Sequence, residues 1–268
     1  MDKRPIGFLD SGVGGLTIWR ATRKLLPDES IVFFADSGHV PYGEKSTEEI
    51  HDLTERIVRF LQSLDVKLIV VACNTATVLA LDYLRETFPE MPFVGVVPVV
   101  KTLARRTRTG TIAVLSTPAT AKSPYLTGLI EEFAPDKEVL RVGCEGLEDM
   151  VEAGNLGGGE MTALLERHLA PVQRSAADVV GLGCTHYPFI RGRIKALLGP
   201  DVTIYDPSRP VARRVRKLLD ERDAFAPNGE PSYRFYTTGD PVVVGEVASK
   251  LLRFPVGDVG YVDLFADA

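Results

Sequence analysis

The sequence has little cysteine and histidine and no long apolar run, and each scarcity excludes a class of protein. Its 268 residues contain three cysteines, Cys73, Cys144 and Cys184, and four histidines. The cysteines are odd in number, widely spaced and without a CxxC pair, so we expect neither a disulfide framework nor a structural zinc site. No apolar run has the length of a membrane span, and the N-terminus lacks the apolar core of a signal peptide. The sequence therefore predicts a cytoplasmic protein without a membrane partner and without a bound metal.

The chain also lacks an excess of basic charge. It contains 31 basic and 36 acidic residues, which gives a net charge of -5. Nucleic-acid-binding domains are usually basic, so this balance argues against direct contact with DNA or RNA. Hydrophobic residues make up 45% of the chain. A chain of this length and composition can bury a large core and can form two domains.

Short apolar runs alternate with helix-like segments along the chain. We interpret nine runs as strands, at residues 5–10, 31–36, 68–74, 93–98, 111–116, 139–144, 179–184, 202–206 and 233–239. Helical patterns cover residues 16–26, 46–64, 75–88, 159–169 and 209–223, and Ser46 with Glu49 forms a capping-box pattern. Most of the strand candidates are continuously apolar, which is typical of strands covered on both faces. The alternation predicts an α/β fold with mainly parallel sheets.

Two stretches of the chain resemble each other. "LIVVACNTAT" and "VVGLGCTHYP" each contain an apolar strand, a small residue, a cysteine and a nearby hydroxyl residue. This internal similarity predicts two similar α/β domains with the active site in the cleft between them. We expect residues 1–97 plus 209–268 to form a discontinuous first domain and residues 98–208 to form the second.

Five predicted strands end in polar or small residues, where a buried strand would normally stay apolar up to the turn. These ends are Asp10-Ser11, Asp36-Ser37, Cys73-Asn74, Ser116-Thr117 and Cys184-Thr185. In open α/β sheets, chemistry gathers at the carboxyl ends of the strands. Two thiols on opposite walls of a cleft suit a reaction in which one removes a proton from carbon and the other delivers one to the opposite face. The alternative is that both cysteines are ordinary core residues, as we expect for Cys144.

Polar neighbours of the two thiols have both a chemical and a structural interpretation. His186 is placed to orient or deprotonate Cys184, and Asp10 to do the same for Cys73; a core histidine and an Asx turn are the alternatives. "DSGVGGL" lacks the third glycine of a dinucleotide fingerprint. We interpret it as an anion nest that includes Ser11, formed by a tight turn with glycines at positive φ. An exposed Tyr42-Gly43 pair would offer further donors to a ligand.

Five segments together resemble the motif blocks of bacterial glutamate racemases, in the aspartate/glutamate racemase superfamily. They are "GFLDSGVGGLT", "ADSGHVPYGEKS", "VACNTAT", "STPATAKS" and "GLGCTHYP", in that family's order, and the closing "FYTTGD" also fits. The resemblance implies an enzyme that interconverts L- and D-glutamate without a cofactor, supplies D-glutamate for peptidoglycan and forms a homodimer. The sequence departs from the family pattern at Ser37-Gly38-His39, where Thr-Ala-Arg or a similar triplet is common.

The resemblance also implies roles for individual residues. Cys73 would serve the D-enantiomer and Cys184 the L-enantiomer, supported by Asp10, His186 and Glu152. The implied substrate-binding residues are Ser11, Tyr42, Gly43, Asn74, Thr75, Thr117, Thr120 and Thr185. Helix capping is the alternative for the hydroxyl and amide residues, and a solvated surface position for Glu152. Two other functions remain open: racemisation of aspartate or a hydantoin, and a non-catalytic thiol or ligand-binding protein with two lobes.

Overall fold

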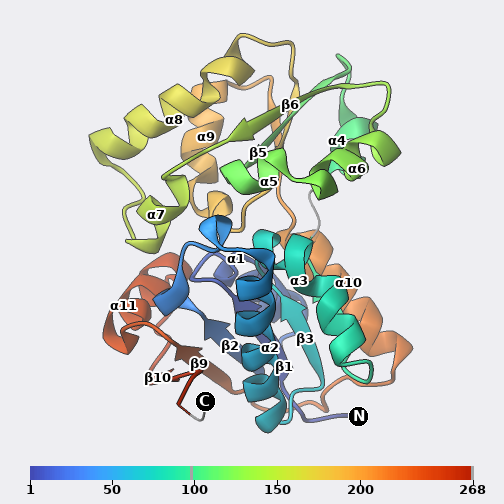
Figure 1. Ribbon diagram of the computed structural model, residues 1–268, viewed down its shortest axis with the longest axis vertical. Helices are drawn as coiled ribbons and strands as arrows, with labels where there is room; N and C mark the ends of the chain where they lie inside the picture. Colours follow the sequence, from blue (N-terminus) through green and yellow to red (C-terminus); the bar gives the residue numbers. More distant parts are fainter. Residues whose placement is uncertain (97–98, 267–268) are drawn as a thin grey trace. The chain divides into compact units, whose positions relative to one another are not determined.

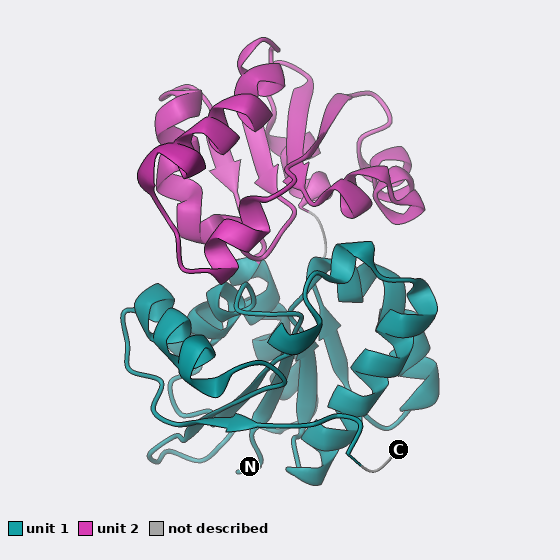
Figure 2. Ribbon diagram, turned by 60° about the vertical axis from the view of Figure 1, so that its left-hand side comes forward, with its two compact units in different colours: residues 1–96, 208–268 teal, residues 97–207 magenta. Residues whose placement is uncertain are grey.

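The computed structural model describes residues 1–96 and 99–266 and separates into two compact units. Unit 1 comprises residues 1–96 and 208–268, and unit 2 comprises residues 97–207 (Figure 2). The first predicted boundary, between residues 97 and 98, lies outside the described residues. At the second crossing, unit 1 resumes at Ser208, one residue before the predicted position.

Unit 1 is built on a six-stranded parallel sheet (Figure 1). The strand order is β10-β9-β2-β1-β3-β4, with β1 (Ile6–Asp10), β2 (Ile31–Ala35), β3 (Leu68–Val71), β4 (Phe93–Gly95), β9 (Tyr233–Thr237) and β10 (Val259–Tyr261). Its helices are α1 (Leu16–Leu25), α2 (Thr47–Ser63), α3 (Asn74–Thr87), α10 (Ser208–Glu221) and α11 (Pro241–Leu252), with short 3-10 turns η1 (Ser37–His39) and η2 (Tyr42–Glu44).

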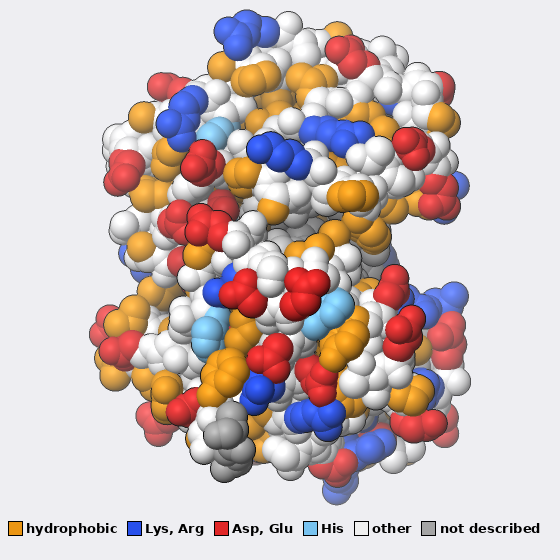
Figure 3. Space-filling view, viewed as in Figure 1, with side chains coloured by type: hydrophobic (Ala, Val, Ile, Leu, Met, Phe, Trp, Pro, Cys, Tyr) orange, Lys and Arg blue, Asp and Glu red, His pale blue; other side chains and the backbone are white. Residues whose placement is uncertain are grey.

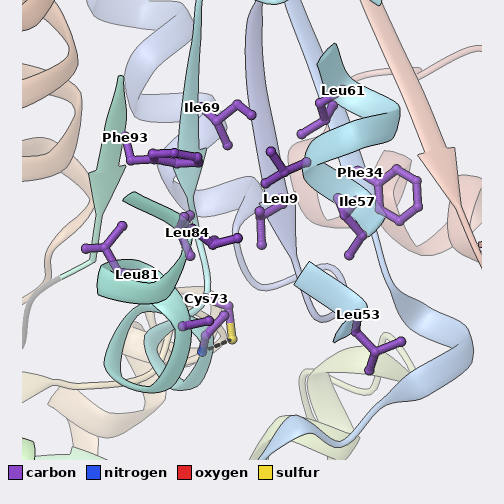
Figure 4. Close-up of a cluster of buried hydrophobic side chains, with 14 of the residues drawn as sticks. Leu9, Phe34, Leu53, Ile57, Leu61, Ile69, Cys73, Leu81, Leu84 and Phe93 are labelled. Atoms are coloured by element: carbon purple, nitrogen blue, oxygen red, sulfur yellow. Dashed lines mark hydrogen bonds between the residues drawn. The ribbon is translucent and has the colours of Figure 1, made fainter. Parts of the chain in front are cut away.

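The helices of unit 1 cover both faces of this sheet. Because side chains alternate along a strand, Leu9 and Phe34 point to one face and Phe8 and Phe33 to the other. The first face packs against α2 and α3 in a cluster of buried side chains (Figure 4). On the other face, α1 packs against α10 and α11, and its Trp19 contacts strand β9. Coverage on both faces explains why the strands are continuously apolar in the sequence.

Unit 2 contains a four-stranded parallel sheet in the order β6-β5-β7-β8. Its strands are β5 (Thr111–Ser116), β6 (Glu138–Gly143), β7 (Val179–Leu182) and β8 (Thr203–Tyr205). Its helices are α4 (Val100–Arg106), α5 (Pro118–Lys122), α6 (Pro124–Phe133), α7 (Leu147–Glu152), α8 (Gly158–Gln173) and α9 (Arg191–Leu198), with the 3-10 turn η3 (Tyr187–Ile190).

The two sheets share one topology. In each unit the first strand lies between the second and the third, and the fourth lies beyond the third; β9 and β10 extend only the sheet of unit 1. Matching backbone bonds continue both sheets past the strand ends. Ala72 N–H donates to the Leu9 carbonyl at 2.7 Å in unit 1, and Gly183 N–H donates to the Leu115 carbonyl at 2.6 Å in unit 2. The predicted α/β class with two similar, mainly parallel domains is confirmed.

Several boundaries differ from the sequence-based prediction. The capping box of Ser46 and Glu49 is present at the start of α2. The predicted strand 68–74 ends at Val71, because Cys73 caps α3 instead. Strand β10 was not predicted, since it has only three residues, which are partly or fully exposed. Helix α8 continues to Gln173, past the predicted end and through Pro171. None of the described helices is long and apolar enough to cross a membrane.

Candidate active site

Cys73 lies at the carboxyl end of β3, where that strand gives way to α3. The residue is the N-cap of the helix, and its sulfur accepts from the Ala76 backbone N–H at 3.5 Å (Figure 4). The Ser11 hydroxyl contacts the same sulfur at 3.4 Å. Cys73 and Ser11 are each 5% exposed. The thiol therefore lies at a helix N-terminus, where the helix dipole favours a thiolate over a thiol.

Asp10 ends β1, the strand beside β3, and its carboxylate is completely buried. One of its oxygens accepts from the Gly15 backbone N–H at 2.6 Å, at the start of α1. The predicted anion nest of the 10–16 turn thus holds at least one carboxylate of the chain itself. The expected positive φ angles are wrong. Gly15 has φ -59°, and among the described residues the glycines with positive φ lie elsewhere.

The reason for glycine at position 15 is space and not backbone strain. A Cβ there would lie 2.8 Å from the Ala72 Cβ and 3.1 Å from the Asp10 Cβ. Real Cβ atoms essentially never come within 3.0 Å of another atom, so the distance to the Ala72 Cβ alone excludes a side chain unless the backbone shifts. Glycine therefore lets α1 start directly against the ends of β1 and β3, which brings Asp10 and Ser11 to the side of Cys73.

Asn74 and Thr75 form the first turn of α3 and are buried, with 4% and 7% exposure. Neither the amide oxygen nor the amide nitrogen of Asn74 has a hydrogen-bond partner among the described residues. Buried polar groups are nearly always paired, because an unpaired one costs about 1–3 kcal/mol. The Asn74 amide, in the residue that follows Cys73, is thus an unsatisfied donor and acceptor, as expected for a group that binds a polar ligand.

Tyr42 and Gly43 lie in η2, and the predicted exposure of Tyr42 is wrong. Tyr42 is only 2% exposed and belongs to the buried cluster that contains Cys73. Its hydroxyl donates to Asp36 at 2.6 Å. Burial, the Asp36 carboxylate and the nearby Cys73 and Asp10 raise the pKa of Tyr42 well above its usual value. Tyr42 therefore stays protonated at all ordinary pH values.

Cys184 occupies the matching position in unit 2, just after β7, and is 5% exposed. Its sulfur lies 3.4 Å from His186 Nδ1. The other ring nitrogen, Nε2, lies 2.5 Å from a carboxylate oxygen of Glu152, the last residue of α7. The side chain of Glu152 is 17% exposed, so the solvated alternative for this residue is wrong. Glu152, His186 and Cys184 therefore form a hydrogen-bonded series.

The charge state of His186 follows from its partners. Burial disfavours the imidazolium, but Cys184 and Glu152 outweigh burial and raise the pKa of His186 well above its usual value. A protonated imidazole donates from both nitrogens. His186 therefore donates to Glu152 on one side and to the Cys184 sulfur on the other, which orients the ring and places a positive charge beside the thiol.

Of the predicted threonines of unit 2, Thr117 and Thr120 lie at the start of α5, and Thr185 lies in the turn between Cys184 and η3. Thr117 is the N-cap of α5, where its hydroxyl accepts from the Thr120 backbone N–H at 3.3 Å and donates to the Thr120 hydroxyl at 3.1 Å. Thr120 and Thr185 are each 2% exposed. The capping role holds for Thr117. Thr117 follows β5 and Cys184 follows β7, the neighbouring strand. Both residues therefore lie at the carboxyl ends of the strands of unit 2.

Three further polar side chains lie near these residues, Asp36, Tyr187 and Glu148, and the sequence did not assign them to the site. In unit 1, Asp36 is completely buried beside Tyr42. In unit 2, the Tyr187 hydroxyl donates to the Cys144 carbonyl at 3.2 Å and lies 3.5 Å from Glu148. Burial raises the pKa of Glu148. Two signals were available in the sequence: Tyr187 adjoins His186, and Asp36 is the polar end of a predicted strand. Neither signal showed which side chains these two residues contact.

Two further observations concern bound groups and disulfides. Among the described residues, no three histidine, cysteine or acidic side chains are grouped as metal ligands would be. All three cysteines are free thiols.

Comparison with known proteins identifies the family. Residues 17–215 match the model of the Asp/Glu/hydantoin racemase family. The chain is 43% identical to the glutamate racemase of Stutzerimonas stutzeri over 237 residues, which is 88% of this chain and 89% of the relative.

Solved structures show the same relationship. Glutamate racemase isoform RacE1 from Bacillus anthracis matches with a TM-score of 0.90 and 34% identity, covering 98% of this chain and 99% of that one. Glutamate racemase from Francisella tularensis, solved in complex with D-glutamate, matches with a TM-score of 0.86 and 32% identity over 98% and 99% of the two chains. The chain therefore belongs to the glutamate racemases of the Asp/Glu/hydantoin racemase family.

Proposed function

We propose that this protein interconverts L- and D-glutamate without a cofactor, by a two-base 1,1-proton transfer between Cys73 and Cys184. The observation that carries the proposal is the pair of buried free thiols. Each follows a central parallel strand and contacts a polar side chain, Ser11 in unit 1 and His186 in unit 2. Two monoprotic groups of this kind fit a reaction that removes one proton from carbon and returns one to the opposite face.

In the L-to-D direction, Cys184 begins as a thiolate and Cys73 as a thiol. Cys184 removes the α-proton of L-glutamate, and the C–H electron pair remains on the α-carbon and spreads into the carboxylate. The Cys73 thiol then donates its proton to the opposite face. D-glutamate leaves, with Cys184 now a thiol and Cys73 a thiolate, so the enzyme is set for the reverse direction. This mechanism requires both sulfurs to reach one α-carbon.

The neighbours of the thiols have proposed supporting roles. The imidazolium of His186, held by Glu152, stabilises the Cys184 thiolate and orients its approach. Asp10 and Ser11 act on the Cys73 side. Hydrogen bonds to the carboxylate of the planar intermediate would lower its energy in a water-poor site.

We assign substrate binding to the polar groups around the two strand ends. The unpaired Asn74 amide is the strongest of these assignments, because it is buried and has donor and acceptor capacity to spare. The remaining assigned residues are Ser11, Tyr42, Gly43, Thr75, Thr117, Thr120 and Thr185. Since the hydroxyl of Tyr42 donates to Asp36, we propose that this residue contributes through its ring and the Tyr42-Gly43 backbone.

We further propose the biological setting that the family resemblance implies. The enzyme would work in the cytoplasm as a homodimer and supply D-glutamate for peptidoglycan synthesis. Size measurement of the purified protein by light scattering tests the dimer. Rescue of a bacterial strain that depends on added D-glutamate tests the supply role.

The direct test of the activity is circular dichroism of L-glutamate incubated with purified protein. The ellipticity should decay to zero, both with and without a chelator, as the amino acid becomes racemic. L-aspartate and a chiral hydantoin are tested in separate incubations as alternative substrates. Faster racemisation of either one would assign the enzyme to another substrate within the same family.

Replacement of either thiol tests the mechanism. Cys184→Ser should lower the racemisation rate by about 10²–10⁴-fold, because an alcohol is a far poorer base than a thiolate. Cys73→Ser should have a similar effect, while Cys144→Ser, which changes a thiol outside the proposed pair, should retain activity. Wild-type turnover by Cys184→Ser would refute the assignment of that residue.

A further inference from the structure

We propose that Thr238 and His39 act as a clamp on Asp36 and thereby position Tyr42 beside Cys73. In this inference, which rests on the proposed racemase function, Thr238 and His39 are positioning residues. They would act through Asp36 and Tyr42 and not by contact with substrate. The clamp would tie the segment between β2 and α2 to the end of β9, a strand from the C-terminal part of the chain.

The carboxylate of Asp36 is the centre of the clamp. Asp36 directly follows β2 and has no exposed surface. Its Oδ1 accepts from the Thr238 hydroxyl at 2.6 Å and lies 2.7 Å from His39 Nδ1. Its Oδ2 accepts from the Tyr42 hydroxyl at 2.6 Å. Three side chains from two distant parts of the sequence thus meet on one buried carboxylate.

Thr238 makes a second contact that fixes the same segment. Its hydroxyl oxygen accepts from the Gly38 backbone N–H at 2.9 Å. Position 38 has no room for a side chain, since a Cβ would lie 2.7 Å from the Thr238 carbonyl oxygen. The 37–39 turn therefore packs directly on the end of β9, and the Thr238 hydroxyl joins the Gly38 amide to the Asp36 carboxylate.

The clamp reaches the candidate site through Tyr42. The turn η2 that contains Tyr42 packs against α3, and Cys73 is the N-cap of that helix. Tyr42 and Cys73 belong to the same buried cluster. The backbone also connects the two sides, because Asp36 N–H donates to the Asp10 carbonyl at 2.9 Å. A shift of Asp36 would therefore move Tyr42 against the helix turn that presents the Cys73 thiol.

Burial of a carboxylate is costly unless donors compensate for the lost water. Here the donors come from Thr238, Tyr42 and His39. The side chain of His39 is 30% exposed and that of Asp36 is fully buried, so His39 lies between the carboxylate and the solvent. It also stands in the triplet where this chain departs from the family pattern. We therefore infer that His39 supplies, in this chain, the donor that completes the clamp.

The test compares Thr238→Val with Thr238→Ser. Valine removes both bonds of the hydroxyl at nearly constant volume, and serine keeps them. A hydrogen bond to a charged group contributes about 1.5–3 kcal/mol, so we expect Thr238→Val to lower kcat/KM about 10- to 100-fold. Thr238→Ser should stay within about threefold of wild type. His39→Ala should resemble Thr238→Val, and His39→Asn, whose amide nitrogen replaces Nδ1, should restore most of the activity.

A kinetic isotope effect separates positioning from a general loss of structure. Enantiomers have equal free energies, so kcat/KM must fall equally in both directions. Proton removal by Cys73, which acts on D-glutamate, should become more rate-limiting in Thr238→Val. The isotope effect with α-deuterated D-glutamate should therefore rise, and that with α-deuterated L-glutamate should rise less. A smaller fraction of folded enzyme would lower kcat but leave KM and both isotope effects unchanged.

Thr87→Val is the matched control, because it removes a hydroxyl that donates to the Tyr83 carbonyl at the far end of α3 from Cys73. It should match wild type. The inference is overturned if Thr238→Val keeps wild-type kcat/KM, or loses activity with both isotope effects unchanged. A wild-type protein that leaves glutamate unaltered would overturn the proposed function, and this inference with it. If the wild-type protein racemises glutamate and Thr238→Val has the same kcat/KM, only the inference is overturned.

Discussion

At the scale of single residues, His186 shows how neighbours set a protonation state. Burial alone would keep this imidazole neutral, whereas Cys184 and Glu152 together raise its pKa. The same unit contains Cys144, whose pKa is raised to about 12 by burial, with smaller contributions from Cys184 and Glu148. Both pKa values are thus raised, and both side chains are held protonated: His186 as a cation and Cys144 as a neutral thiol.

The raised pKa of His186 predicts how stability depends on pH. A group whose pKa is higher in the folded state stabilises the fold fully below its unfolded pKa, about 6.5 for histidine, and loses this contribution as pH rises through the folded value. Glu152→Gln should therefore cost about 1.5–3 kcal/mol near pH 6, and less at higher pH. Urea unfolding of both proteins from about pH 5 upward measures this difference.

The control for this series is Glu145→Gln, which changes an exposed acidic residue of the same unit. It should leave unfolding nearly unchanged at every pH. A cost of Glu152→Gln that grows as the pH rises would contradict the assigned charge state of His186.

The high pKa of Cys144 predicts low thiol reactivity. A thiol with a pKa of about 12 is almost entirely protonated at pH 8, and only the thiolate reacts with alkylating agents. In the native protein, iodoacetamide should leave Cys144 unmodified long after it has reacted with any other cysteine. Peptide mass mapping measures this, with urea-unfolded protein as the control in which all three react. Labelling of native Cys144 as fast as Cys73 would contradict the prediction.

At the scale of elements, the strand cores were predictable and their ends were not. Strands such as β3 and β7 are buried on both faces, so their apolar runs reveal them directly. Where a strand ends depends on the hydrogen bonds that its last residues make. Cys73 reads as the continuation of a strand, but its sulfur accepts the Ala76 amide and starts a helix. Such capping bonds form between neighbours in space and leave little trace in a hydrophobicity pattern.

The partners in the candidate site show the same limit. Proximity in sequence was enough to pair His186 with Cys184, two positions apart. Glu152, however, lies 34 residues before His186, and only the family resemblance indicated it. Thr238 lies 202 residues after Asp36, and nothing in the sequence indicated that contact. Contacts across a sheet depend on strand order, which residue spacing does not encode.

A buried ion pair lies at the amino-terminal ends of the strands in unit 1. Lys67 Nζ lies 2.5 Å from a carboxylate oxygen of Glu29, and their side chains are 1% and 3% exposed. Lys67 also donates to the carbonyls of Asp2 and Ala224, at 2.9 and 2.8 Å. These bonds join the N-terminal and C-terminal parts of the discontinuous unit at the amino-terminal ends of the strands, whereas Cys73 lies at their carboxyl ends.

Loss of this pair should be costly without affecting the chemistry. Lys67→Met leaves a buried carboxylate unpaired and should lower the free energy of unfolding by about 3–5 kcal/mol. Lys67→Met with Glu29→Leu should recover part of this loss. Urea unfolding measures the stability, and the racemisation rate per folded molecule should match wild type. If Lys67→Met has the same free energy of unfolding as wild type, the ion pair does not contribute to stability.

At the scale of the whole molecule, the two units repeat one plan. Both sheets place their first strand between the second and third. In such sheets, ligands bind where the chain passes from one side of the first strand to the other, at the carboxyl ends of the strands. That position is held by Asp10 and Cys73 in unit 1 and by Thr117 and Cys184 in unit 2. The resemblance between the two cysteine segments, visible in the sequence, thus reflects equivalent positions in two similar folds.

Charges of both signs are mixed on the face of the molecule that Figure 3 shows. On α2, for example, Arg56 pairs with Asp52 and Arg59 with Glu55. In these two pairs, each arginine lies one helical turn from a carboxylate of opposite charge.

The most direct test of the two-thiol account is the position of deuterium after a brief reaction of L-glutamate in D₂O. With two bases, Cys184 keeps the abstracted proton while Cys73 delivers a deuteron. The account therefore predicts that the D-glutamate formed carries deuterium at its α-carbon and that the remaining L-glutamate carries none. Separation of the enantiomers followed by mass spectrometry measures both. Deuterium in the recovered L-glutamate at a level similar to that in the product would indicate a single base and contradict the account.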